Sequence, residues 1–575
     1  MNTLTPGALT VLEKRYLKRD ETGRVVETPD GLFRRVAANV ASAEAIYGGS
    51  AALYEEEFHS LMSSLEFLPN SPTLMNAGRR LQQLAACFVL PVGDSLESIF
   101  EAVKNTAIIH QSGGGTGFSF SRLRPSNAIV GSTGALASGP VSFMRVFNAA
   151  TEAIKQGGAR RGANMGVLRV DHPDIASFIT VKRDPAELRN FNLSVAVTDA
   201  FMDALAKDAD YALIDPRTGA EAGKKSAKEV FGLIVEAAWA GGEPGVLFID
   251  RINRANPTPQ LGQIEATNPC GEQPLLAYEP CNLGSVNLSR MLKREGRPAR
   301  WRIDYAKLER TVSLGLRFLD DVIDMSRYPV GEIEVMAKAN RKVGLGVMGF
   351  ADMLARMRLP YGGAESLALA EELMRFISGA AWEESLRLAE ARGPFPNIKG
   401  SVFDKPGTAP VRNATVTTIA PTGTLSIIAG CSSGIEPIYS LSYTRRILNG
   451  AEIPEVNPIL VEVAGEEGNS PPDFIEFIAS GGDIKSRDDV PEEIKKVFVT
   501  AFDLPPEAHV RMQAAFQKYT DNAVSKTINM ASDASIEAAA AAYLLAYELG
   551  CKGITVYRSG TRTGQALSCK STLYC

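Results

Sequence analysis

From about residue 71 onward the sequence alternates short apolar runs with longer amphipathic segments, and this alternation limits the fold more than any other feature. The apolar runs have the length and composition of buried strands, at 87–90, 117–120, 166–170 and 193–197. The amphipathic segments have the apolar spacing of helices, at 95–111, 142–155, 199–206 and 226–240. Strands and helices that alternate over such a length predict an α/β fold.

Residues 1 to about 70 follow a different pattern and are expected to form a helical N-terminal region. Thr28-Pro29-Asp30 predicts a helix start, because proline suits the first turn of a helix. Apolar residues follow at helical spacing until Tyr47-Gly48-Gly49, and a second helix is expected over 51–65. The chain is therefore expected to divide into a helical region at 1–70, an α/β domain at 71–558 and a flexible tail at 559–575. Within the domain, residues 448–510 are rich in Pro, Glu, Gly and Asp, which predicts a surface insertion with short helices.

Composition excludes some classes of protein. With 575 residues, 45% hydrophobic and 22% charged, the chain can bury a large core. A net charge of −5 argues against a general nucleic-acid binder. No apolar run reaches the roughly 18 residues of a membrane helix, and the N-terminus lacks the pattern of a signal peptide. The seven cysteines include no C-x-x-C pair, and the four histidines are scattered, so neither a disulfide scaffold nor a protein metal site is expected. A reducing, cytoplasmic setting is expected.

Three cysteines stand in settings that suggest thiol chemistry. Cys270 lies two residues from Asn268 and two from Glu272, Cys281 follows eleven residues later, and Cys87 lies far upstream. A free cysteine is more often a small buried hydrophobe, so this alternative stays open for each residue taken alone. It is the preferred reading for Cys431 and Cys551.

Three glycine-rich segments, at 112–117, 156–162 and 420–426, could hold a ligand. The first precedes a strand, so it is neither a Rossmann fingerprint nor a P-loop, and a tight turn is an equal alternative. The second carries Arg160 and Arg161, which suit an anion. The third presents Thr422 and Thr424 just before an apolar run, as in a phosphate-binding helix start.

Taken together, these motifs resemble the class II ribonucleotide reductases, which depend on adenosylcobalamin. The resemblance runs from about residue 6 to 562, and its most specific parts are 68–74, 112–118, 156–175, 268–272, 281–288, 421–426 and 553–558. It implies a ten-stranded α/β barrel of two five-stranded halves, preceded by the helical region. A central finger loop inside the barrel would carry Cys270.

The resemblance also implies a role for each reactive residue. Homolysis of the cofactor's cobalt–carbon bond would lead to a thiyl radical on Cys270, which abstracts the substrate's 3′-hydrogen. Glu272 would accept the 3′-OH proton, and Asn268 would hold the sugar hydroxyls. Cys87 and Cys281 would reduce the intermediate and end as a disulfide, which requires Cβ atoms within about 4.5 Å. Further positions match substrate contacts, namely Ser71, Ala86 and Gly115, and phosphate contacts, namely Thr422 and Thr424.

In the family, a C-terminal cysteine pair regenerates that disulfide by thiol–disulfide exchange. Cys569 and Cys575 occupy the corresponding place and would pass electrons from a thioredoxin- or glutaredoxin-type reductant. Their wide spacing departs from the family's usual tail.

Class I large subunits share the barrel and the three cysteines but receive their radical from a second subunit through two adjacent tyrosines. The matching position here is Val556-Tyr557, and valine cannot carry a redox hole. This favours adenosylcobalamin and no radical-generating second subunit. Resemblance to a glycyl-radical reductase is weaker. A catalytically silent nucleotide-binding relative is disfavoured because Cys87, Cys281 and the Asn268–Glu272 segment are all retained.

The resemblance implies allosteric control of substrate choice in a homodimer. Asp94 and Arg124 match residues that bind a deoxynucleotide or ATP effector, although on their own they suggest a helix cap and a solvated arginine. Arg183 and Arg189 fall in a loop that links effector to substrate. No ATP-cone domain is expected before the helical region, so dATP should not inhibit. Substrates are expected to be ribonucleoside diphosphates, which Mg²⁺ could accompany, and the deoxynucleotides would serve DNA synthesis and repair.

Overall fold

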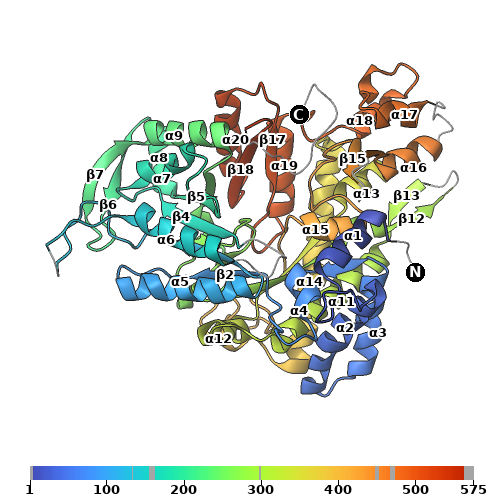
Figure 1. Ribbon diagram of the computed structural model, residues 1–575, viewed down its shortest axis with the longest axis horizontal. Coiled ribbons are helices and arrows are strands. Elements are labelled where there is room, and N and C mark those ends of the chain that lie inside the picture. The colour runs from blue at the N-terminus through green and yellow to red at the C-terminus, as the bar shows by residue number, and fades with distance from the viewer. Residues whose placement is uncertain are drawn as a thin grey trace.

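The computed structural model describes residues 4–131, 134–154, 162–296, 300–446, 452–466 and 473–561. Its first helices, α1 (Pro6–Arg15), α2 (Pro29–Ala41) and α3 (Ala51–Ser63), gather beside the long helices α11 (Tyr305–Met325) and α14 (Ala364–Arg392) (Figure 1). The predicted helix start is confirmed, because the Thr28 hydroxyl caps α2 by accepting the Gly31 N–H at 3.0 Å. Its apolar face, including Leu32, Phe33 and Val36, is buried. Among the described residues, none of the helices combines the length and apolar character that a membrane span requires.

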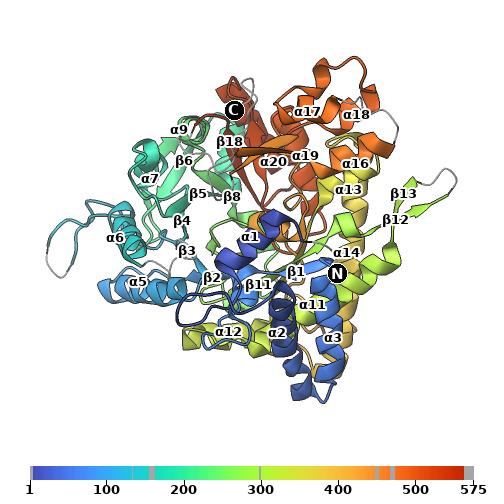
Figure 2. The ribbon, with the colours of Figure 1, turned by 45° about the vertical axis from the view of Figure 1, so that its right-hand side comes forward.

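The first half of the sheet contains five parallel strands. They run in the order β2 (Cys87–Leu90), β3 (Gly115–Ser119), β4 (Asn164–Arg169), β5 (Phe191–Val197) and β8 (Gly245–Phe248). The helices between them are α5 (Leu96–Gln111), α6 (Pro140–Ala153), α7 (Ile175–Thr180), α8 (Asp199–Ala206) and α9 (Ala227–Gly241). Figure 2 shows α5, α6, α7 and α9 on the outer side of the strands.

The second half is built from β11 (Pro280–Asn287), β14 (Val343–Met348), the extended segment 415–419, β17 (Thr527–Met530) and β18 (Gly553–Arg558). Parallel bridges from Leu345 to Thr417 and from Ile419 to Val524 join the middle segment to its neighbours. The halves meet antiparallel, β11 against β2 and β18 against β8. Strand pairing therefore runs around a closed ring, and the predicted barrel of two five-stranded halves is confirmed.

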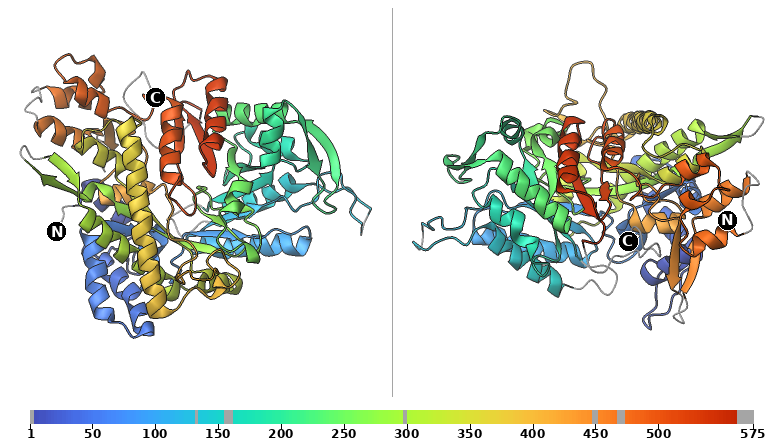
Figure 3. Two further views of the ribbon diagram at one scale, coloured as in Figure 1. Left: turned by 180° about the vertical axis from the view of Figure 1, so that it is seen from behind. Right: turned by 90° about the horizontal axis from the view of Figure 1, so that it is seen from above.

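The remaining elements lie around this ring (Figure 3). The strand β1 (Phe67–Pro69) pairs with β11 and leads into α4 (Ser71–Asn76). Three hairpins are β6 (Asp210–Ile214) with β7 (Glu221–Ser226), β12 (Leu292–Glu295) with β13 (Arg300–Ile303), and β15 (Ser442–Arg446) with β16 (Glu452–Val456). The other helices are α10 (Ile249–Arg254), α12 (Gly331–Asn340), α13 (Phe350–Arg356), α15 (Gly423–Ala429), α16 (Pro458–Glu466), α17 (Phe474–Ala479), α18 (Glu492–Val497), α19 (Pro506–Gln517) and α20 (Ile536–Glu548). Of these, α16 to α18 share a small separate core that includes Leu460, Val463 and Phe474.

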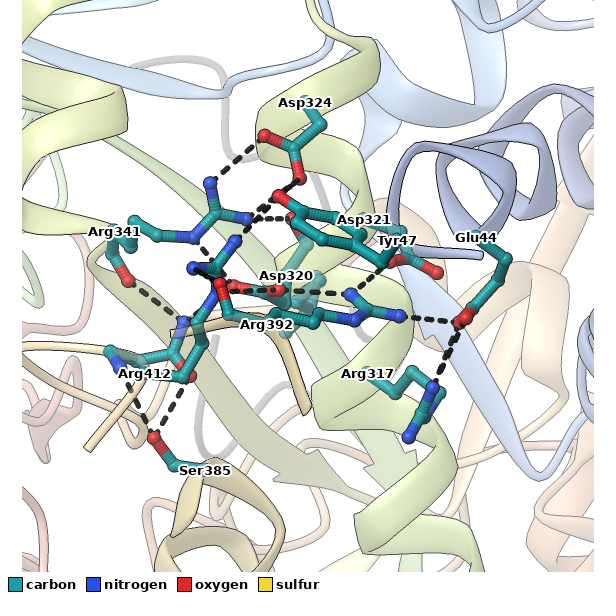
Figure 4. Close-up of polar contacts among 12 residues, drawn as sticks. Glu44, Tyr47, Arg317, Asp320, Asp321, Asp324, Arg341, Ser385, Arg392 and Arg412 are labelled. Carbon is teal, nitrogen blue, oxygen red and sulfur yellow. Dashed lines mark hydrogen bonds and ion pairs between the residues drawn. The ribbon is translucent and has the colours of Figure 1, made fainter. Parts of the chain in front are cut away.

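A buried network of charges joins the helical region to the second half of the barrel (Figure 4). Asp320 in α11 contacts Arg341, Arg392 and Arg412 at 2.9, 3.0 and 3.3 Å, and Arg392 also contacts Glu44 at 2.6 Å. Burial alone would raise the pKa of Asp320, but Arg341 and the other two arginines hold it well below its usual range. Removing one member of such a network leaves an uncompensated buried charge, which costs about 3–5 kcal/mol.

A short hairpin, β9 (Ala266–Thr267) with β10 (Pro274–Leu275), occupies the interior of the ring. Ala266 and Leu275 share one core with Val167, Leu247 and Leu283, which come from strands of both halves. The hairpin lies so close to β3 that a Cβ at Gly117 would stand 1.8 Å from the Thr267 carbonyl oxygen. Glycine at 117 is therefore required for the hairpin to enter the barrel.

We predict that Gly117→Ala lowers the melting temperature in a thermal unfolding experiment. The added methyl must displace backbone, so the loss should reach or exceed the about 1–3 kcal/mol typical of overpacking. Gly232→Ala in α9 is the matched control, because a Cβ there meets nothing within 4 Å. It should be neutral or stabilising by up to about 1 kcal/mol. An unchanged melting temperature for Gly117→Ala would contradict the close approach.

Candidate active site

The turn between β9 and β10, residues 268–273, places Cys270 at its tip. Cys270 is exposed and lines a cavity of about 520 Å³. Pro269 and Gly271 line the same cavity, whose opposite walls come from β5, β8, β17, β18 and the start of α15. The hairpin thus presents one thiol to this cavity.

Asn268 shapes this turn and contacts a second cysteine. Its Oδ1 accepts the Gln273 N–H at 3.0 Å, and its carbonyl accepts the Gly271 N–H at 3.0 Å. Gly271 has φ +82°, a left-handed conformation that favours glycine. The Asn268 Nδ2 group donates to the Sγ of Cys87 at 3.1 Å. The structure therefore brings Asn268, Cys270 and Cys87 close together.

Glu272 belongs to the same turn, and its side chain is buried. Burial raises the pKa of its carboxyl from 4.5 to about 7, and a hydrogen bond from Asn268 opposes this shift. Within the described part of the chain, its Oε2 atom has no hydrogen-bond partner. The backbone carbonyl of Glu272 is held by Thr418 Oγ1 at 2.8 Å and by the Ala523 N–H at 3.0 Å. A buried carboxyl with a pKa near neutrality is suited to accept and return a proton.

Cys87 and Cys281 face each other across the antiparallel junction of β2 and β11. Both are buried free thiols, 5% and 1% exposed. Residues in such register have Cβ atoms about 4.5–5.5 Å apart, which brings the two sulfurs within reach of a disulfide. Burial raises the pKa of each thiol well above its usual value.

Two of the three substrate candidates, Ala86 and Gly115, lie next to this pair. Gly115 donates its N–H to the Ala86 carbonyl at 2.9 Å, and Ala86 donates its own to the Cys281 carbonyl at 3.2 Å. A Cβ at Gly115 would stand 3.0 Å from the Pro269 ring. Ser71 begins α4, and its hydroxyl shares a 2.7 Å hydrogen bond with that of Tyr16.

The phosphate candidates stand at the start of α15. Thr422 has φ +55°, and its hydroxyl accepts the Gly434 N–H at 2.7 Å, while Thr424 is half-buried in the first turn. Pro421 and Gly423 line the same cavity as Cys270. The backbone of this turn therefore borders the cavity directly.

The two effector candidates contact each other. The Asp94 carboxylate accepts the Arg124 backbone N–H at 3.0 Å and pairs with its Nε at 2.9 Å. Asp94 is not the cap of α5, because Ser95 accepts the Ser98 N–H.

The loop candidates lie before β5. Arg183 pairs with Glu236 at 3.2 Å on the surface, and Arg189 is exposed. The tail cysteines Cys569 and Cys575, and the loop arginines Arg160 and Arg161, lie outside the described residues.

Sequence reasoning missed three polar groups in and around this site. Asn192 lines the cavity and donates Nδ2 to the Pro269 carbonyl at 2.8 Å; its signal is a polar residue within an apolar run. Lys526 pairs with Glu436 at 2.6 Å in the cavity wall, and burial lowers the pKa of Lys526. The third is an ion pair between Lys342 and Glu279, beside Cys281.

Comparisons with known proteins identify the family of this chain. The family model "Ribonucleotide reductase, barrel domain" matches residues 85–409 and 406–557, and "Ribonucleotide reductase, all-alpha domain" matches residues 2–82. The chain belongs to the ribonucleotide reductase family.

Two curated relatives are named "Vitamin B12-dependent ribonucleoside-diphosphate reductase". The protein of Thermoplasma acidophilum is 49% identical over 98% of this chain and 80% of its own length. The protein of Mycobacterium tuberculosis (strain H37Rv) is 50% identical over 98% and 79%. The predicted resemblance to class II is thereby confirmed. The fold is also similar to the Actinobacillus ureae class Id ribonucleotide reductase alpha subunit, with a TM-score of 0.79, 21% identity and 97% coverage of both chains.

We predict that Glu272 titrates near pH 7. Because its folded-state pKa is raised from 4.5 to about 7, its neutral form favours folding at low pH, and this contribution is lost as the pH rises through 7. An infrared difference spectrum between the wild type and Glu272→Gln should show one protonated carboxyl below that pH and none well above it. Absence of the band at about pH 5.5, roughly one unit above the ordinary glutamate value, would contradict the raised pKa.

Proposed function

We propose that this chain is a vitamin B12-dependent ribonucleoside-diphosphate reductase that works through a thiyl radical on Cys270. The observation that carries the proposal is the turn between β9 and β10, here called the finger, which exposes Cys270 to the cavity. The same turn holds Glu272 and Asn268 in place, with Asn268 touching Cys87.

Four residues of the site have defined parts in this reaction. The Cys270 sulfur takes the 3′-hydrogen of the ribose and returns it at the end. Glu272 takes the 3′-OH proton, which favours loss of the 2′-OH as water. Cys87 and Cys281 supply the two electrons and two protons that complete reduction, and their sulfurs become a disulfide.

The residues around Cys270 suit adenosylcobalamin. The cavity beside Cys270 has room for a nucleoside-sized group, and Gly245, Gly553 and Val556 line it on β8 and β18. Bound there, the cofactor would supply the hydrogen-abstracting radical. The chain's share is to hold Cys270 toward that group and to exclude water.

Regeneration and control complete the proposal. Cys569 and Cys575 would exchange with the Cys87–Cys281 disulfide and be reduced by a thioredoxin- or glutaredoxin-type dithiol. Asp94 and Arg124 would bind a deoxynucleotide or ATP effector in a homodimer, and the loop with Arg183 and Arg189 would pass its effect to the substrate. The products would serve DNA synthesis and repair.

We predict that reduction of ribonucleoside diphosphates with dithiothreitol requires added adenosylcobalamin and no second protein. Cys270→Ser should abolish product formation while nucleotide binding, measured by calorimetry, is retained. Cys431→Ser is the matched control and should stay active, because Cys431 lies outside the cavity lining. Turnover without the cofactor, or turnover by Cys270→Ser, would refute the proposal.

We also predict that each deoxynucleoside triphosphate effector changes which of the four substrates is preferred. In Asp94→Asn the effector response should weaken, because the charge that holds Arg124 in place is lost. Competition assays with mixed substrates measure this preference. Equal preferences with all effectors in the wild type would contradict specificity control.

A further inference from the structure

Beside Cys281 lies a buried ion pair that the reaction above does not use. Lys342 Nζ stands 2.7 Å from Glu279 Oε2, and both side chains are 1% exposed. Glu279 also accepts the Leu276 N–H at 2.7 Å and is bonded by Asn340 Nδ2. Buried charges are unfavourable unless they are paired, so a complete pair next to a reactive thiol invites a functional explanation.

Strand register places Lys342 beside Cys281. Asn282 of β11 pairs with Val343 of β14, so the preceding residues, Cys281 and Lys342, are also neighbours. Leu283 and Gly344 face the finger, because a Cβ at Gly344 would stand 2.5 Å from Gln273 Nε2. Side chains two positions apart share a face, which puts the thiol and the ammonium on that same side. Both residues also line one small cavity of about 10 Å³.

The two members of the cysteine pair therefore differ in their electrostatic surroundings. Burial raises the pKa of Cys87, and Glu272 raises it further. Among the groups described near Cys87, the neutral amide of Asn268 lowers this pKa. For Cys281, Lys342 lowers the pKa, opposed by Glu279 and Glu272. A thiolate is favoured at the sulfur that faces a cation.

Resting on the function proposed above, we propose that Lys342 is a positioning residue for reduction of the Cys87–Cys281 disulfide. It directs the reductant to Cys87 by stabilising Cys281 as the leaving thiolate. The thiolate of a dithiol reductant attacks the Cys87 sulfur, a new S–S bond forms, and the Cys87–Cys281 bond breaks with its electron pair on Cys281. The reductant's second thiol then releases Cys87 and becomes oxidised, and both cysteines take protons from solvent.

Other charged groups also lie near Cys281 and Lys342. Glu279 comes from the turn before β11, Glu272 from the finger, and Lys552 from the start of β18. Burial lowers the pKa of Lys552 to about 8, Asp521 opposes this, and Lys342 lowers it further. Lys342 is the cation among the groups that act on Cys281 directly.

The test forms the disulfide chemically, with diamide in the purified full chain, so that no cofactor or turnover is needed. A monothiol, 2-mercaptoethanol, is then added, the reaction is quenched with acid, and the mixed disulfide is located by peptide mass spectrometry. In the wild type we expect it on Cys87, with Cys281 free. Lys342→Met should reduce this preference by about tenfold, the effect of roughly one pKa unit, while Lys342→Arg retains it. A mixed disulfide mainly on Cys281, an unchanged preference in Lys342→Met, or no Cys87–Cys281 disulfide would overturn the proposal.

A second readout separates this role from a purely structural one. In the reduced chain, iodoacetamide alkylation of Cys281 against pH should shift upward in Lys342→Met and downward in Glu279→Gln, by about one pH unit each. A structural pair would shift both variants in the same direction, which would overturn the proposal. The double variant Lys342→Met/Glu279→Gln leaves no unpaired charge and should lose the preference like Lys342→Met. Lys338→Met, at an exposed pair on α12, is the control. Because no step requires nucleotide reduction, loss of reductase activity alone would count against the proposed function and not against this inference.

Discussion

The site depends on one close approach of two backbones inside the barrel. The hairpin of β9 and β10 crosses β3 where Gly117 leaves room for the Thr267 carbonyl, and Gly115 leaves similar room for Pro269. A ten-stranded ring is wider than side chains from its own strands need, and the hairpin fills that space with Ala266 and Leu275. The position of Cys270 follows from this packing, because its turn is only six residues long and is pinned by Asn268, Asn192 and Thr418.

The buried charge network around Asp320 is connected to the same site through two consecutive residues. Arg341 ends α12 with φ +46°, and its side chain points into the cluster around Asp320. The next residue, Lys342, pairs with Glu279 and lines the same small cavity as Cys281. The helical region therefore fixes the start of β14, and β14 in turn sets the surroundings of the cysteine pair. This connection gives a physical reason why the helical region packs against the barrel.

Local signals in the sequence predicted much of this fold. The Thr28 cap, the proline that follows it and the apolar spacing placed α2 correctly, and α8 matches its expected range of 199–206. The strands β2 to β5 were found because they are apolar and bounded by turns. No strand was predicted at 415–419 because its threonine-rich sequence lacks an apolar run. This segment nevertheless joins β14 to the 523–530 stretch of the ring.

The candidate site was predicted in its residue types and not in its geometry. Asn268, Cys270 and Glu272 are close in sequence, so their proximity follows from the turn. The register that opposes Cys87 to Cys281 depends on strand order over 194 positions, and local patterns do not encode it. Lys342 and Asn192 gain significance only from what they touch.

The most direct test of the account is a single turnover without external reductant. The fully reduced chain is mixed with a ribonucleoside diphosphate and adenosylcobalamin, and thiols are then trapped and mapped by mass spectrometry in a variant that lacks Cys569 and Cys575. The account predicts a disulfide between the Cys87 and Cys281 peptides, formed in equal amount to the deoxynucleotide. Product formed while Cys87 and Cys281 both remain free thiols would contradict it.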